Sequence, residues 1–166
     1  MRMWMVDPAI MCRAHLLGEH VEMHMFIGAI AKGTSMLGFA KSGLLETREL
    51  YQRHDDLVTE MLRRGMNHNS PMPEVELPEN VIDATVDREW SLEVLLDKCK
   101  DCQDRYDQKY GRYIAAGYQN RKEYLKGLAE EYGVEYEIVV TLADTLGPNE
   151  DFDGLVSGIQ DYAEYE

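Results

Sequence analysis

The sequence predicts an all-α protein, with a compact helical domain followed by an acidic helical C-terminal extension. Two observations favour this fold class. Helix-forming residues such as Met, Leu, Ala, Glu, Lys and Arg are abundant, and few segments alternate apolar and polar residues with the two-residue period of a strand. Apolar residues make up 45% of the chain, which is enough for a hydrophobic core.

The helix boundaries follow from caps and breaks. Pro8 suits the first turn of a helix that has Asp7 as its cap, and Gly65 stands where a glycine commonly ends a helix. Three prolines between Asn67 and Pro78 indicate a loop. We expect helices, in chain order, over residues 8 or 13–31, 47–64, 91–110, 121–132, 138–146 and 151–162.

Charge divides the chain into unlike parts. Residues 1–73 hold eight Lys or Arg, eight Asp or Glu and all five histidines, whereas residues 74–166 hold nine Lys or Arg and twenty-three Asp or Glu. The second part therefore carries the whole net charge of −14. We predict three segments: a helical core at 1–73, a helical continuation with a Cys-x-x-Cys motif at 74–118, and an acidic extension resembling a helix-turn-helix at 119–166. Any contact with an anionic polymer such as DNA has to lie in the first.

Composition also limits the compartment and the cofactors. No run of about 18 apolar residues and no signal-peptide pattern is present, so we expect no membrane span and a cytoplasmic location, with reduced cysteines. Cys99 and Cys102 could begin a zinc site, as could His20 and His24, but a structural site needs four ligands. The histidine pair has no identified third ligand. For the cysteine pair, the remaining cysteine of the chain, Cys12, lies far away in the sequence. We therefore expect no metal and no cofactor.

The helix that begins near Arg13 carries an unusual polar stripe. It is apolar almost all round, which is typical of a buried helix. Yet His15, Glu19 and Glu22 stand at i, i+4 and i+7 and so share one face. Buried ionisable groups are usually paired or functional. Two interpretations stay open: carboxylates that are solvated or paired with Arg13 or Arg2, and a catalytic carboxylate in a partly buried cleft.

Two blocks of sequence stand out in the first segment. One is Arg13-Ala-His15-Leu-Leu-Gly-Glu19-His-Val-Glu22-Met-His24, preceded by the opening Met1-Arg2-Met-Trp4. The other is Leu50-Tyr51-x-Arg53-His54-Asp55-x-Leu57-x-x-Glu60-Met61-x-Arg63-Arg64-Gly65-x-Asn67-His68-x-Ser70-Pro71. In their order and separation the two blocks resemble the pyrimidine dimer DNA glycosylase family of the endonuclease V type, over residues 1 to about 73.

The resemblance implies an all-α DNA glycosylase with abasic-site lyase activity, which needs no metal and acts on double-stranded DNA with a damaged pyrimidine or an abasic site. In this family the α-amine of the first residue attacks the sugar C1′, and the resulting imine permits β-elimination. An α-amine suits this role because its pKa is lower than that of a lysine ammonium. The resemblance implies that Met1 is the nucleophile and that Glu22, which matches the second Glu of the family's motif, stabilises the cationic sugar and transfers protons. Within this resemblance we expect supporting or DNA-binding roles for Arg2, Arg13, His15, Glu19, His24, Arg53, His54, Arg63, Arg64 and His68.

The chain departs from the phage prototype of this family in two respects. The prototype begins with Thr after processing, whereas Met1 is followed here by Arg2, so we expect the methionine to stay and to supply the amine. Val21 and Met25 stand where the prototype has basic residues, which weakens the expected phosphate contacts. For Arg63 and Arg64, stabilisation of a helix end is an equally open interpretation.

A second hypothesis is a non-enzymatic protein derived from the same family, whose acidic second half binds a protein partner. This hypothesis is based on the net charge of −14, which is carried by the second half of the chain. The helix-turn-helix pattern around Gly133 has Glu135 and Glu137 where a DNA reader would meet phosphates, so we expect packing or protein contact from it.

Overall fold

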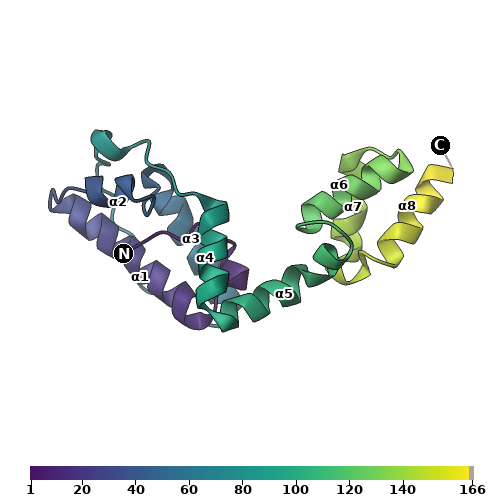
Figure 1. Cartoon of the computed structure of the whole chain (residues 1–166), viewed down its shortest axis with the longest axis horizontal. Helices are drawn as coiled ribbons and strands as arrows, with labels where there is room; N and C mark the ends of the chain where they lie inside the picture. Colours follow the sequence, from purple (N-terminus) through teal and green to yellow (C-terminus); the bar gives the residue numbers. More distant parts are fainter. Residues whose placement is uncertain (165–166) are drawn as a thin grey trace. The chain divides into compact units, whose positions relative to one another are not determined.

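The computed structural model describes residues 1–164, which form eight α-helices and no strand in that range (Figure 1). The all-α prediction is therefore confirmed. The chain divides into two compact units, Met1–Asp107 and Gln108–Glu166. None of the described helices has both the length and the apolar character needed to cross a lipid bilayer.

The first unit is built around α1 (Arg13–Ala31), which packs against α3 (Leu50–Arg63). Leu16, Met23 and Phe26 of α1 are fully buried, as the apolar pattern around this helix predicts. The other helical elements of this unit are 3₁₀ turns at Pro8–Ile10, Thr47–Glu49 and Glu79–Val81, the helices α2 (Leu37–Lys41) and α4 (Arg88–Lys98), and the start of α5 (Lys100–Ala115).

Several predicted boundaries are confirmed and one is wrong. Asp7 caps the 3₁₀ turn that has Pro8 in its first position. Gly65 follows α3 with a φ of 71°, a conformation in which a Cβ atom is strained. The helix expected over 91–110 is two helices, α4 and α5, because the backbone is extended at Cys99 (φ −134°, ψ 102°). Cys99 consequently lies between two helices instead of inside one.

Residues 74–107 pack on the N-terminal core. Val81, Val86 and Leu95 are buried. The Thr47 hydroxyl donates a hydrogen bond of 2.7 Å to the carbonyl of Val81, which ties this segment to the 3₁₀ turn that precedes α3. The first compact unit thus extends to Asp107, well past the boundary expected at residue 73.

The second unit consists of α6 (Arg121–Tyr132), α7 (Tyr136–Leu146) and α8 (Gly154–Glu164), with a 3₁₀ turn at Pro148–Glu150 and the end of α5. Gly133 has a φ of 66° and ends α6 in the left-handed conformation. Glu135 and Glu137 at the start of α7 are exposed. The buried core of this unit comprises Tyr113, Tyr124, Leu125, Leu128, Ala129, Val134, Val139, Ala143, Leu155 and Ile159.

Asp151 is a fully buried carboxylate in the second unit. It accepts hydrogen bonds from the Tyr113 hydroxyl at 2.6 Å and from Arg121 Nε and Nη2 at 2.7 and 2.9 Å. Burial, and then the hydrogen bond to Asp151, raise the pKa of Tyr113, so this phenol stays neutral and donates. A charge buried in this way is stable only while it is paired.

We expect Asp151→Ala to lower the free energy of unfolding of the second unit by about 2–3 kcal/mol, because Arg121 and Tyr113 lose their shared acceptor. Urea denaturation followed by circular dichroism measures the effect. Asp144→Ala is the matched control, because Asp144 also pairs with Arg121 but its side chain is 67% exposed. Equal losses in the two variants would contradict a special role for the buried carboxylate.

Candidate active site at the N-terminus

The backbone amine of Met1 lies 3.7 Å from Glu22 Oε1. The backbone N–H of Arg2 donates a hydrogen bond of 3.0 Å to Glu22 Oε2, so both carboxylate oxygens of Glu22 face the start of the chain. The Met1 and Glu22 side chains are 16% and 29% exposed, which leaves the pair within reach of a ligand. Figure 1 shows the N-terminus beside α1, the helix that carries Glu22.

Glu19 holds the N-terminal segment in place, one turn before Glu22 on α1. Its Oε1 accepts hydrogen bonds from the backbone N–H of Trp4 at 2.7 Å and from Arg53 Nε at 3.0 Å, and its Oε2 accepts from Arg53 Nη2 at 2.6 Å. Arg53 Nη1 donates a further bond of 2.6 Å to the carbonyl of Val6. Glu19 and Arg53 are almost completely buried, so this network positions Met1 from inside the core.

Two further tethers fix the first five residues. The N–H of Met3 donates to the carbonyl of Leu44 at 2.9 Å, and the Ser91 hydroxyl donates to the carbonyl of Trp4 at 2.6 Å. Met5 has a φ of 53°, an uncommon conformation for a residue with a side chain. Strain of this kind persists only where the surrounding contacts over-determine the backbone, as they do here.

Arg2 lies between two aromatic rings beside the amine. Its guanidinium carbon is 3.7 Å from the centre of the Trp4 ring and 5.4 Å from that of Trp90, and its Nη2 donates to Ser91 at 3.0 Å. Burial lowers the pKa of Arg2, whereas the charges of Glu19 and Glu22 act in the opposite direction. Trp90 is 47% exposed. The roles of Trp4, Trp90 and Ser91 were not predicted from the sequence, since Trp90 and Ser91 lie about 90 residues from the N-terminus.

The other predicted arginines are engaged within the protein or lie at its surface. Arg53 is 3% exposed and serves Glu19, so it supports the site and is withdrawn from a DNA backbone. Arg64 binds Glu60 and the carbonyls of Pro8, Ala9 and Met11, and only 10% of its side chain is exposed. Arg63 also pairs with Glu60 but is 64% exposed, and Arg13 is exposed.

All five histidines and all three cysteines of the chain gather in two clusters. The potential ligand atoms within each cluster lie within 4.8 Å of one another. The thiol cluster is Cys12, His15, Cys99 and Cys102, and the imidazole cluster is His20, His24, His54 and His68. No third ligand was identified for either pair from the sequence, but the fold brings a third and a fourth potential ligand to each. The predicted supporting histidines thus lie in these clusters, not beside Met1.

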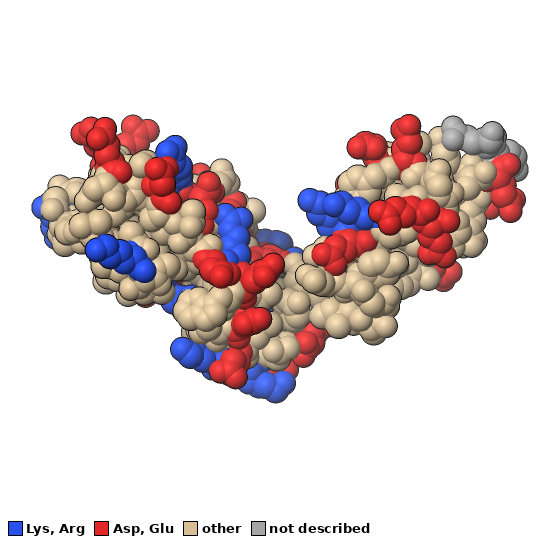
Figure 2. Space-filling view, turned by 45° about the horizontal axis from the view of Figure 1, so that its top comes forward, with Lys and Arg blue, Asp and Glu red and all other residues tan. Residues whose placement is uncertain are grey.

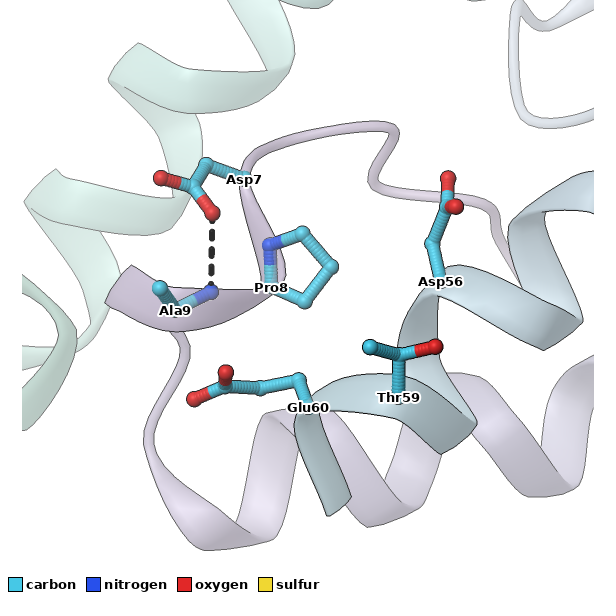
Figure 3. A pocket seen from close by; sticks show the side chains of 6 residues that line it. All are labelled: Asp7, Pro8, Ala9, Asp56, Thr59 and Glu60. Carbon is cyan, nitrogen blue, oxygen red and sulfur yellow. Dashed lines mark hydrogen bonds between the residues drawn. The ribbon is translucent and has the colours of Figure 1, made fainter. Parts of the chain in front are cut away.

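A hollow of about 270 Å³ lies elsewhere in the first unit, between the 3₁₀ turn after Asp7 and α3 (Figure 3). It is lined by Asp7, Pro8, Ala9, Asp56, Thr59 and Glu60. Three of these six side chains are carboxylates, which disfavours the binding of phosphate, and neither Met1 nor Glu22 borders it. We therefore do not assign the active site to it.

The surface charge of the two units differs (Figure 2). On the face shown, basic and acidic side chains mix over the first unit, whereas acidic side chains predominate on the second. This matches the sequence, in which residues 108–166 hold five Lys or Arg and twelve Asp or Glu. A polyanionic ligand is therefore better accommodated by the first unit than by the second.

Comparison with known proteins bears on the same region. A family model described as pyrimidine dimer DNA glycosylase matches residues 1–74. No curated protein and no solved structure matches the chain. The matched segment contains Met1, Arg2, Glu19, Glu22 and Arg53, which form the site described above. Residues 1–74, which are somewhat less than half of the chain, are therefore similar to the pyrimidine dimer DNA glycosylase family.

Proposed function

We propose that the protein is a DNA glycosylase and abasic-site lyase that uses the α-amine of Met1 as its nucleophile. The observation that carries the proposal is the distance of 3.7 Å between this amine and Glu22 Oε1, at a partly exposed position. A nucleophile needs a nearby group that accepts its proton, and the substrate has to reach both groups. The family match over residues 1–74 supports the same class of reaction.

The chemistry follows from an amine beside a carboxylate. The neutral amine forms a bond to C1′ of the nucleotide, the bond between C1′ and the base breaks, and the base leaves with the electron pair and takes up a proton. Loss of the amine proton and opening of the sugar ring at O4′, which is protonated, leave an imine. Removal of a C2′ proton then expels the 3′ phosphate and breaks the DNA strand.

Glu22 has two roles in this sequence. Its negative charge stabilises the cationic sugar and the protonated imine, since both develop positive charge next to it. Its carboxylate also accepts the amine proton and can return a proton to O4′. The hydrogen bond from the N–H of Arg2 to the other oxygen fixes the orientation of the carboxylate.

Arg2 and Trp90 are the DNA-binding groups that we propose at this site. The guanidinium of Arg2 is held by Trp4 and Ser91 and supplies a cation for a phosphate near the reacting sugar. The exposed ring of Trp90 offers a face on which an unstacked base can stack. Arg13 and Arg63 are exposed cations on the same unit and are candidates for further phosphate contacts.

Borohydride trapping tests the proposal. We expect the protein, incubated with duplex DNA that contains one abasic site, to form a covalent complex on reduction, and peptide mass spectrometry to locate the adduct on Met1. One extra glycine before Met1 should abolish trapping, because the amine is then displaced from Glu22. One extra glycine at the C-terminus is the matched control and should leave trapping unchanged. Trapping that survives the N-terminal extension would contradict the assignment of the nucleophile.

The alternative function is a non-enzymatic protein that binds a partner through its acidic second half. The excess of acidic side chains on residues 108–166 favours a basic partner. The same experiment separates the two functions, because the alternative requires that no covalent complex forms and that DNA binding is absent even at low salt.

A further inference from the structure

We propose that the first unit holds two structural metal ions: a zinc ion in the thiol cluster and a second divalent ion in the imidazole cluster. The two clusters use different ligands, come from different elements and are supported by separate observations. Together they account for every histidine and cysteine in the chain.

The distances in the thiol cluster match tetrahedral zinc. With Zn–S of about 2.3 Å and Zn–N of about 2.0–2.1 Å, ligands at the corners of a tetrahedron are separated by about 3.8 Å for two sulfurs and about 3.5 Å for sulfur and nitrogen. The Sγ atoms of Cys12 and Cys99 are 3.8 Å apart. His15 Nδ1 lies 3.3 Å from Cys12 Sγ and 3.5 Å from Cys102 Sγ. The three measured separations agree with a zinc site of three thiolates and one imidazole.

Local structure explains how the chain presents these four ligands. Cys12 caps α1 and His15 follows three residues later, in the first turn. Cys99 lies at the break between α4 and α5, and Cys102 follows in the first turn of α5. The backbone N–H of Cys12 donates to Cys102 Sγ at 3.2 Å, and that of His15 donates to Cys12 Sγ at 3.5 Å. These bonds fix the orientation of the two sulfur atoms within the cluster.

The imidazole cluster is marked by four buried nitrogens that have no partner. The Nε2 atoms of His20, His24, His54 and His68 are all buried, and none forms a hydrogen bond. His20 and His54 are 6% and 4% exposed. Buried polar atoms are nearly always satisfied, so four unsatisfied ones within a few ångströms of each other need a common partner. In the tautomer that carries its proton on Nδ1, each ring directs an Nε2 lone pair, and a metal ion is the electron-pair acceptor that can satisfy all four.

The arrangement of the four rings also fits tetrahedral coordination. For a metal–nitrogen distance of about 2.05 Å, ring centres around one ion are separated by about 5.2 Å. The five measured centre-to-centre distances in the cluster lie between 4.9 and 5.2 Å. His54 Nδ1 lies 3.1 Å from the carboxylate of Asp55, an arrangement that leaves the Nε2 lone pair of His54 free for a metal.

Both ions are structural, because four protein ligands leave no open position for a substrate. The imidazole cluster joins α1 to α3 and to His68 in the following loop, and the thiol cluster joins the start of α1 to the junction of α4 and α5. Glu22 lies between His20 and His24 along α1. The two ions therefore fix the helix that carries the candidate catalytic carboxylate.

Elemental analysis of the full-length protein, expressed with added zinc and purified without chelator, tests the proposal. We expect two equivalents of divalent metal per chain, including at least one of zinc. Substitution with Co²⁺ should give the intense near-ultraviolet absorption of thiolate-to-cobalt charge transfer together with the visible bands of tetrahedral cobalt. Metal content is measured without DNA, so this result is independent of the glycosylase proposal.

Two variants separate the sites, and each serves as the control for the other. Cys99→Ser should lose one equivalent of metal and the charge-transfer band, whereas His68→Ala should lose one equivalent and keep that band. Chelator should lower the Tm of the wild-type protein and added zinc should restore it, which tests the proposal even if a variant does not fold. Less than about a tenth of an equivalent of metal in the wild-type protein, a disulfide between Cys12 and Cys99, or a Tm unaffected by chelator would overturn it.

Discussion

Glu22→Gln is expected to lower the rate of abasic-site cleavage by about 10²–10⁴-fold, because the amide can neither accept the proton of the Met1 amine nor stabilise the cationic sugar. The substitution keeps the shape of the side chain, and its carbonyl can still accept the hydrogen bond from the N–H of Arg2. The fold should therefore be retained. Single-turnover cleavage of a duplex with one abasic site measures the effect, together with the yield of the borohydride-trapped complex.

Glu93→Gln provides the matched control for this experiment. Glu93 is exposed on α4 of the same unit, so its substitution makes the same change in net charge at a carboxylate other than the one beside the amine. We expect its cleavage rate to stay within a factor of a few of the wild-type rate. If both variants lost activity equally, a general charge effect on DNA binding would explain the result and Glu22 would have no catalytic role.

Arg53→Ala is expected to lower the free energy of unfolding by about 3–5 kcal/mol, since it leaves the buried carboxylate of Glu19 without its cation. The side chains of Glu19 and Arg53 are 0% and 4% exposed. The variant should also loosen the N-terminal segment, because Glu19 binds the N–H of Trp4. Urea denaturation of the full-length protein, followed by circular dichroism, measures the loss.

Arg48→Ala is the control for Arg53. Arg48 also pairs with a carboxylate, that of Asp83, but the two side chains are 65% and 83% exposed. Exposed pairs of this kind contribute about 0–1 kcal/mol. We further expect the double variant Glu19→Gln with Arg53→Met to recover part of the loss, because it removes both buried charges. Equal costs for the Arg48 and Arg53 variants would show that burial of the pair does not contribute.

Local features of the fold could be predicted from the sequence, whereas contacts between distant segments could not. The ends of α1 and α6 follow from caps, helix-breaking residues and periodicity, all of which act within a few residues. The break at Cys99 was missed because no proline or glycine marks it. An extended residue in that position is held by tertiary contacts, among them the contact between the sulfurs of Cys99 and Cys12.

The same distinction between local features and distant contacts applies to the candidate site. Glu19 and Glu22 could be predicted because they share one face of a single helix. The ligands of the two clusters could not, since Cys12 and Cys102 are 90 positions apart and only the packing of α1 against the α4–α5 junction brings them together. One signal was available without a fold: every histidine and cysteine lies within the first 102 residues. This confinement means that any site built from histidines and cysteines of this chain lies in the first unit.

The placement of Arg2 between Trp4 and Trp90 gives the protein an internal optical probe. These are the only two tryptophans in the chain, and both rings lie near the guanidinium of Arg2, the residue that follows the proposed nucleophile. Emission excited selectively from indole therefore arises from the first unit alone, and residues 108–166 contribute none of it. Quenching of that signal during a titration would report the arrival of a nucleobase or phosphate at the amine without any attached dye.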